Sequence, residues 1–288
     1  MPSLFDDESP LPIFRRDLEL YPGPEEVDGS PTFNLYDPIR AKFFKLTWAE
    51  ALIFQHHKQG MKLDDLAEDV EKTTTLRVTK DQIKFFFFDA YQQELLALLR
   101  PSEQIEKIKE SKKQNIFMWV IYNYLFIKIP IFNPDKFLTR TLKYVKPFGS
   151  STAFFLYGFA SIIGLFMLFT RLGEFFHTFT YFFNVQGFII YGLAISMVKM
   201  VHEFSHAYTA KKYGLYVPSM GLAFIVLWPV LYTDVTDGWK LKSRKQRLYI
   251  SAAGIIAESV IAGLSTIGWF FTAPGTMNSI FFVVASIT

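Results

Sequence analysis

The chain has 288 residues, of which 50% are hydrophobic and 18% aromatic, and it carries a formal net charge of +3 at pH 7. This composition excludes an ordinary soluble globular domain and is typical of a membrane protein with aromatic side chains at the bilayer interfaces. No basic stretch is long enough to indicate nucleic-acid binding. Because the chain has no cysteine, a metal site must use histidine and carboxylate ligands.

Residues 1–30 are acidic and rich in proline. Acidic side chains outnumber the two basic ones, Arg15 and Arg16, and the first residues contain no apolar stretch of the kind found in signal peptides. We therefore expect an extended or loosely structured lead without a cleaved signal.

Residues 31–100 have the pattern of a small soluble domain. Two capping boxes, Thr47–Glu50 and Thr79–Gln82, each precede an apolar run and predict helices, the second running through Leu98. A third helix is predicted between them over Lys62–Lys72.

A strand is predicted over Thr32–Tyr36, ahead of these helices. One strand followed by three short helices favours a winged-helix-like domain. The alternative is a helical linker without a binding role.

Residues 101–148 are expected to link this domain to the membrane. The apolar segment Ile116–Ile127 has about 12 residues, too few to cross a bilayer, and predicts an interfacial helix. The basic residues Arg140, Lys143 and Lys146 follow, which by the positive-inside rule indicates the cytoplasmic side.

Residues 149–288 contain the apolar runs of a polytopic membrane domain. Three runs are long enough to cross with their neutral flanks, and a fourth stops after about 12 residues. The runs are Phe154–Thr170, Phe188–Val201 with its continuation to Lys212, Ser251–Thr272 and Met277–Thr288.

The segment Gly221–Tyr232 is apolar, has about 12 residues and contains Pro229. Basic clusters stand on both sides of it, so a full crossing would place one cluster outside, against the charge rule. A re-entrant hairpin satisfies both clusters and predicts a protein-lined or water-filled cavity. The predicted fold is mainly α: polytopic membrane helices with a re-entrant segment, preceded by a small soluble winged-helix-like domain.

The sequence His202-Glu203-Phe204-Ser205-His206 lies at the end of an apolar helix. Histidines four residues apart share one helix face and can bind one zinc ion, with Glu203 beside them as a general base for a metal-bound water. Ionisable groups at membrane depth are costly and usually functional. The alternative is a set of polar contacts between helices.

The stretches HEFSHAYTAKKYG and VPSMGLAFIVLWPVLYTDVTDGWKLKSRKQRLYISAAGIIAES resemble the site-2 protease clan, peptidase family M50. With IPIFNPDKFLTR and APGTMNSIFFVVASIT, the chain is similar to the branch of peptide zinc metalloproteases. The stretch beginning FNLYDPIRAKFFKLTWAEALI resembles PqqD-like winged-helix domains. The resemblance implies a zinc endopeptidase and, as partners, HlyD-type adaptors or other peptide-export components.

The resemblance also implies a third zinc ligand, an aspartate in a motif similar to NPLLRFDGYYLL. That motif is not present, so we expect an N-terminal fragment with an incomplete zinc site. Asp234 and Asp237 are the internal candidates, and the alternative for both is an ordinary loop role.

Glu258 is a further intramembrane acid, surrounded by small residues that permit close helix packing. It is expected either to hydrogen-bond a metal-binding histidine or the hairpin backbone, or to make a structural contact between helices.

Two functions remain open from these patterns. The first is a membrane-embedded zinc metalloprotease in the bacterial inner membrane, with a cytoplasmic N-terminal domain and a peptide or protein as substrate. The second is a catalytically inactive membrane component of a peptide-export assembly.

Overall fold

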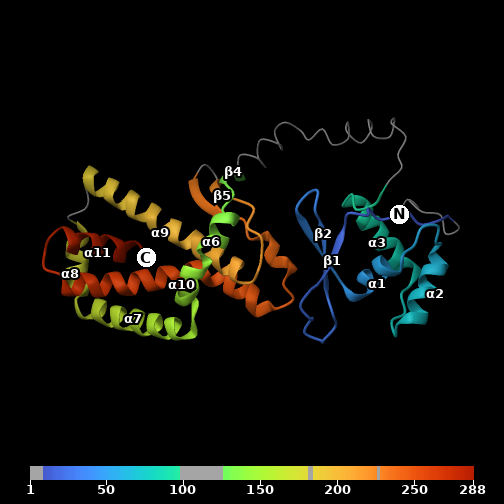
Figure 1. The fold of residues 1–288 in the computed structure, drawn as a ribbon, viewed down its shortest axis with the longest axis horizontal. Helices are drawn as coiled ribbons and strands as arrows, with labels where there is room; N and C mark the ends of the chain where they lie inside the picture. Colours follow the sequence, from blue (N-terminus) through green and yellow to red (C-terminus); the bar gives the residue numbers. More distant parts are fainter. Residues whose placement is uncertain (1–8, 98–125, 181–183, 226–227) are drawn as a thin grey trace. The chain divides into compact units, whose positions relative to one another are not determined.

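The computed structural model describes residues 9–97, 126–180, 184–225 and 228–288 (Figure 1). The chain divides into two compact units. The first comprises Met1–Trp119 with Trp239–Arg244, and the second comprises Val120–Gly238 with Lys245–Thr288.

The first unit contains a three-stranded antiparallel sheet in the order β1-β2-β3 and three helices. The strands are β1 (Glu19–Pro22), β2 (Phe33–Asp37) and β3 (Lys42–Leu46), and the helices are α1 (Trp48–His56), α2 (Leu63–Thr73) and α3 (Lys80–Gln92). Both predicted capping boxes are confirmed, since the Thr47 and Thr79 hydroxyls accept from the backbone amides three residues on.

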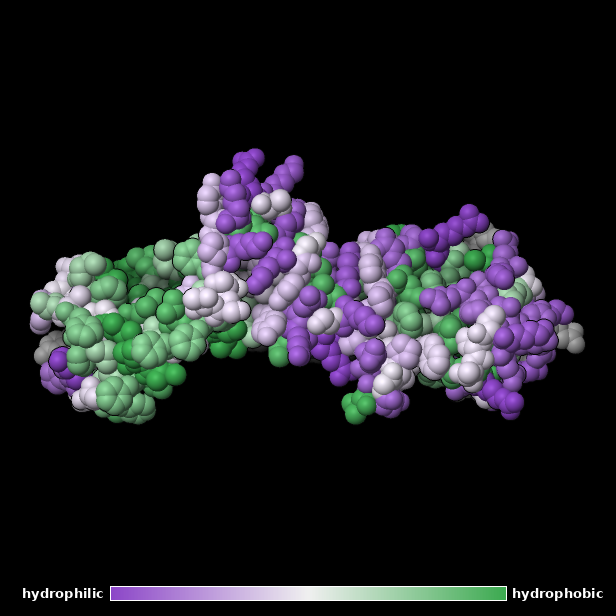
Figure 2. Space-filling model, turned by 60° about the horizontal axis from the view of Figure 1, so that its bottom comes forward, coloured by the Kyte–Doolittle hydropathy of each residue, from purple (hydrophilic) through white to green (hydrophobic). Residues whose placement is uncertain are grey.

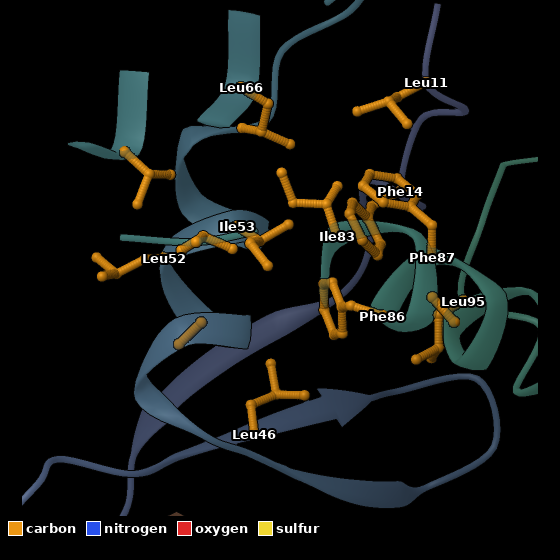
Figure 3. Close-up of a cluster of buried hydrophobic side chains, with 14 of the residues drawn as sticks. Leu11, Phe14, Leu46, Leu52, Ile53, Leu66, Ile83, Phe86, Phe87 and Leu95 are labelled. Atoms are coloured by element: carbon orange, nitrogen blue, oxygen red, sulfur yellow. The ribbon is translucent and has the colours of Figure 1, made fainter. Parts of the chain in front are cut away.

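The core of the first unit lies between the helices and the sheet. Ile53, Leu66, Ile83 and Phe87 are almost fully buried, and Figure 3 shows the aromatic rings of the cluster turned toward one another. The rings of Phe14 and Phe87 lie 5.1 Å apart, a separation typical of favourable aromatic pairs.

The lead, predicted to be extended or loosely structured, is partly folded into the first unit in its described part. Leu11 and Phe14 are buried in the core, and Glu19–Pro22 pairs with β2 as strand β1. The prediction that the last helix of this unit runs through Leu98 is wrong, since α3 ends at Gln92. The chain leaves the helical conformation at Glu94, whose φ is 56°, so that Leu96 can pair with Phe14.

The second unit is mainly helical. Its helices are α6 (Asp135–Val145), η1 (Lys146–Gly149), α7 (Ser151–Thr170), α8 (Leu172–Thr180), α9 (Val185–Lys212), α10 (Arg244–Phe271) and α11 (Thr276–Ile287), and η2 spans Thr236–Lys240. In length and composition α7, α9 and α10 can cross a membrane, which confirms the three predicted spans. Hydrophobic side chains cover much of the outer surface of this helical part (Figure 2).

A second three-stranded antiparallel sheet lies in this unit, in the order β4-β5-β6. Its strands are β4 (Phe126–Phe132), β5 (Met220–Ile225) and β6 (Trp228–Thr233). The segment predicted as a re-entrant hairpin is thus a β-hairpin, and its entry into a bilayer stays a prediction. Gly221 allows β4 and β5 to approach, because a Cβ there would lie 2.1 Å from the Ile129 carbonyl oxygen.

The predicted interfacial helix Ile116–Ile127 lies largely outside the described residues. Its last two residues belong to strand β4, so the helix prediction is wrong there. The pairing of β4 with β5, about 90 residues later in the chain, is a nonlocal contact that overrides the local apolar pattern.

Candidate functional site

Helix α9 places His202 and His206 one turn apart on the same face, as predicted. Their Nε2 atoms lie 3.0 Å apart and their ring centroids 4.8 Å apart. Both side chains are mostly enclosed, because α10 packs against this face.

Helix α10 supplies one partner for each imidazole. The backbone carbonyl of Ile250 lies 2.6 Å from His206 Nδ1, and Glu258 Oε1 lies 3.0 Å from His202 Nδ1. These partners stand eight residues apart, two turns along one face of α10. Glu258 makes two of the contacts that were left open for it, one with His202 and one with another side chain of α9, Lys199.

Gly254 lies between these two partners on α10. A Cβ atom at this position would lie 2.3 Å from His202 Nε2, well inside contact distance. The absence of a side chain therefore lets α10 approach the imidazole closely, as the run of small residues around Glu258 suggested.

Lys199 is a member of this cluster that the sequence patterns did not single out. Its Nζ lies 2.6 Å from Glu258 Oε1, the same oxygen that contacts His202. The signal available was a lone cation within an apolar helix, which usually has an ionic partner. The Glu258 carboxylate is thus shared between a cation and an imidazole.

Glu203 lies next to His202 and is half-buried. Its backbone carbonyl accepts a hydrogen bond from Thr233 Oγ1 at 3.1 Å, which ties the end of β6 to α9. Its carboxylate makes no hydrogen bond with any described residue, so the group is available to a ligand.

Asp234 and Asp237 are not gathered with the histidines. Asp234 Oδ1 accepts from the backbone amide of Thr236 at 3.0 Å, and its own amide donates to the Ser219 carbonyl, so it organises the loop after β6. Asp237 lies in η2. Within the described ranges no three His, Asp or Glu side chains form a group that could hold a metal ion.

The hydrogen bonds indicate the protonation pattern of the histidine pair. A carbonyl and a carboxylate can only accept, so neutral rings carry their proton on Nδ1 and leave a lone pair on each Nε2. Two lone pairs 3.0 Å apart repel each other, and a shared cation relieves that repulsion. Two nitrogens on one tetrahedral zinc ion lie about 3.3 Å apart, so the pair fits this metal.

The comparisons with known proteins agree with this arrangement. Residues 188–286, from the first turn of α9 to the end of α11, match the family model for peptidase family M50. Neither a curated protein nor a solved structure matches the chain. The likeness of residues 31–100 to PqqD-like domains stays a prediction. The part of the chain that contains the histidine pair and its partners is thus similar to peptidase family M50, and α7, α9 and α10 are long and apolar enough to cross a membrane.

Proposed function

We propose that this chain carries the catalytic helix of a membrane-embedded zinc metallopeptidase, with His202 and His206 as metal ligands and Glu203 as general base. The observation that carries this is the geometry of the two imidazole rings. Their Nε2 atoms lie 3.0 Å apart, and the Nδ1 atom of each ring has a hydrogen-bond acceptor. A substrate with peptide bonds follows from the family.

The residues of the chain divide the chemistry between them. A bound zinc ion supplies Lewis acidity and lowers the pKa of a coordinated water. Glu203 accepts a proton from the attacking water and returns it to the leaving amine nitrogen. Glu258 and the Ile250 carbonyl hold the imidazoles in one tautomer and orientation, as the hydrogen-bond acceptors of metal-binding histidines commonly do.

A catalytic zinc site usually has three protein ligands and one water. Helix α9 supplies two of them in this proposal. The third is the aspartate that the resemblance implies, with Asp234 and Asp237 as alternatives that would require the loop after β6 to rearrange.

Zinc stoichiometry tests the ligand assignment. A protein with the complete ligand set should retain zinc in detergent, and His202→Ala in that protein should lose it. His177→Ala, on α8, is the matched control and should retain it. Equal zinc content in all three proteins would overturn the assignment.

Peptide hydrolysis tests the role of Glu203. In a protein with the complete ligand set, Glu203→Gln should keep its zinc and lose hydrolysis, since removal of a general base costs about 10²–10⁴-fold in rate. Hydrolysis by this variant at the rate of the unaltered protein would contradict the mechanism.

The second candidate is an inactive membrane component of a peptide-export assembly, with HlyD-type adaptors as partners. It is favoured by the lack of a three-residue metal group within the described ranges. No stoichiometric zinc in a protein with the complete ligand set would support it over the peptidase.

We further propose that the chain lies in a bacterial inner membrane with its N-terminal domain in the cytoplasm. Helix α9 ends at Lys211-Lys212 and α10 begins at Arg244, with a hairpin between them, so these basic ends share one side. Positive charge marks the cytoplasmic side. A topology reporter fused at Lys245 that reads as external would overturn this orientation.

A further inference from the structure

A large apolar cavity lies on another side of α9 from the histidine pair. It has a volume of about 930 Å³ and is enclosed by the end of α6, η1, α7, α9 and α10, all within the second unit. Phe204, which lines it, is two residues after His202 and so stands about 200° around the helix. The volume is at the upper end of the range for ligand pockets, about 300–1,000 Å³.

The mouth of this cavity is basic. A smaller cavity of about 370 Å³ adjoins it and shares Lys146, Gly149 and Lys212 with its lining, and Lys143 also faces the smaller one. Lys212 Nζ donates to the Gly149 carbonyl at 3.0 Å, a neutral partner. Within the described residues none of the three lysines is paired with a carboxylate, so the positive charge of the mouth is uncompensated.

The cavity has the depth of one membrane leaflet. On α9 its lining runs from Lys212 to Met200, and on α10 from Tyr249 to Ile261. Each stretch spans twelve residue steps, about 18 Å at 1.5 Å per residue. Half of a bilayer's hydrocarbon core is about 15 Å, so the cavity reaches from the headgroup level to the midplane.

We propose that this cavity binds one anionic phospholipid, with its phosphate at Lys146 and Lys212 and its acyl chains along α7, α9 and α10. A basic mouth at the helix ends above an apolar groove of leaflet depth matches both parts of such a lipid. The site does not depend on the proposed peptidase activity.

Lipid titration followed by native mass spectrometry tests the proposal on the whole purified chain. Phosphatidylglycerol and phosphatidylcholine with identical acyl chains are the probes. The variant Lys146→Gln/Lys212→Gln should lose on the order of thirtyfold in the preference for phosphatidylglycerol, since each interfacial lysine contributes to anionic-lipid binding. Lys136→Gln/Lys245→Gln, with the same charge change at exposed lysines outside the mouth, should keep that preference.

A second pair of variants tests the groove. Val260→Trp fills it and should reduce the binding of both lipids, whereas Ile255→Trp, at an exposed position of α10 outside the lining, should not. Equal affinity of the unaltered protein for the two lipids would overturn the proposal. Displacement of phosphatidylglycerol by millimolar inorganic phosphate would also overturn it, because the mouth would then be a site for free anions.

Discussion

Each unit contains a carboxylate held by two nitrogen partners. In the first unit Asp37 is bound by Arg15 at 2.7 Å and by Arg40 at 2.6 Å, and its side chain is fully buried. In the second unit Glu258 is bound by Lys199 and His202, and its side chain remains 18% exposed.

The two carboxylates differ in the chemical nature of their nitrogen partners and in the further contacts of those partners. Both partners of Asp37 are permanent cations, so the cluster is closed and stabilises the turn between β2 and β3. One partner of Glu258 is an imidazole whose other nitrogen faces a second imidazole. The same carboxylate chemistry therefore supports structure in one unit and orients a candidate ligand in the other.

The largest expected effect is that of Asp37→Ala on the first unit. It removes the buried carboxylate that Arg15 and Arg40 share, leaves them only the more exposed Asp17 and Glu94, and should destabilise the unit by about 3 kcal/mol. Hydrogen exchange of the whole chain should then accelerate in peptides covering β2 and β3. Asp28→Ala, at an exposed loop aspartate, is the control and should leave this exchange unchanged.

Gly254→Ala should disturb the contacts of His202 with α10 in the second unit. The added Cβ would lie 2.3 Å from His202 Nε2, so the imidazole or α10 must move, at a cost of about 2 kcal/mol. Zinc content should fall. Gly192→Ala on α9 adds the same atom where nothing lies within 4 Å, and it should retain zinc. Loss of zinc in both variants would show that the effect of Gly254→Ala does not come from the contact of the added Cβ with His202.

Acid should weaken the ion pairs of Asp37 with Arg15 and Arg40 in the first unit. Burial raises the pKa of the Asp37 carboxyl, but hydrogen bonds from Arg15 and Arg40 outweigh burial and hold this pKa at about 2. A lowered pKa stabilises the fold above about pH 4, and this contribution, about 2 kcal/mol, is lost as the pH falls toward 2. Exchange rates in β2 and β3 at pH 4 and pH 2 measure it, and Asp37→Asn should remove most of the difference.

Glu258→Gln should have the smallest of these effects. It keeps a hydrogen-bond acceptor for His202 Nδ1 but removes the charge, and zinc affinity should fall by about tenfold. Competition with a chelator measures this affinity. Glu174→Gln, at an exposed acid on α8, is the matched control, and an equal loss there would show that the effect is not specific to the histidine pair.

Several features of the fold follow from local patterns and could be predicted. The capping boxes at Thr47 and Thr79 begin helices through contacts three residues apart. The spans α7, α9 and α10 are long apolar runs, and a spacing of four residues puts His202 and His206 on one helix face.

Two features that the local patterns did not predict depend on contacts between distant parts of the chain. Leu11, Phe14 and strand β1 join a core whose other members come from residues 33–96, although the lead itself has a disordered composition. The strand β4 forms by pairing with β5, which local periodicity does not reveal.

Local patterns are enough to predict the helix that carries HEFSH, the apolar runs long enough to cross a membrane and the chemical types of the candidate ligands, because each depends on residues within a few turns of one another. The atoms that contact the two histidines, by contrast, depend on the packing of α10 against α9. The Ile250 acceptor is a backbone carbonyl without a residue-type signal, and it lies 44 residues from His206. The contacts of Glu258 with Lys199 and His202 join α10 to α9 across 59 and 56 residues. Such contacts depend on how the helices pack, and Gly254 permits that approach.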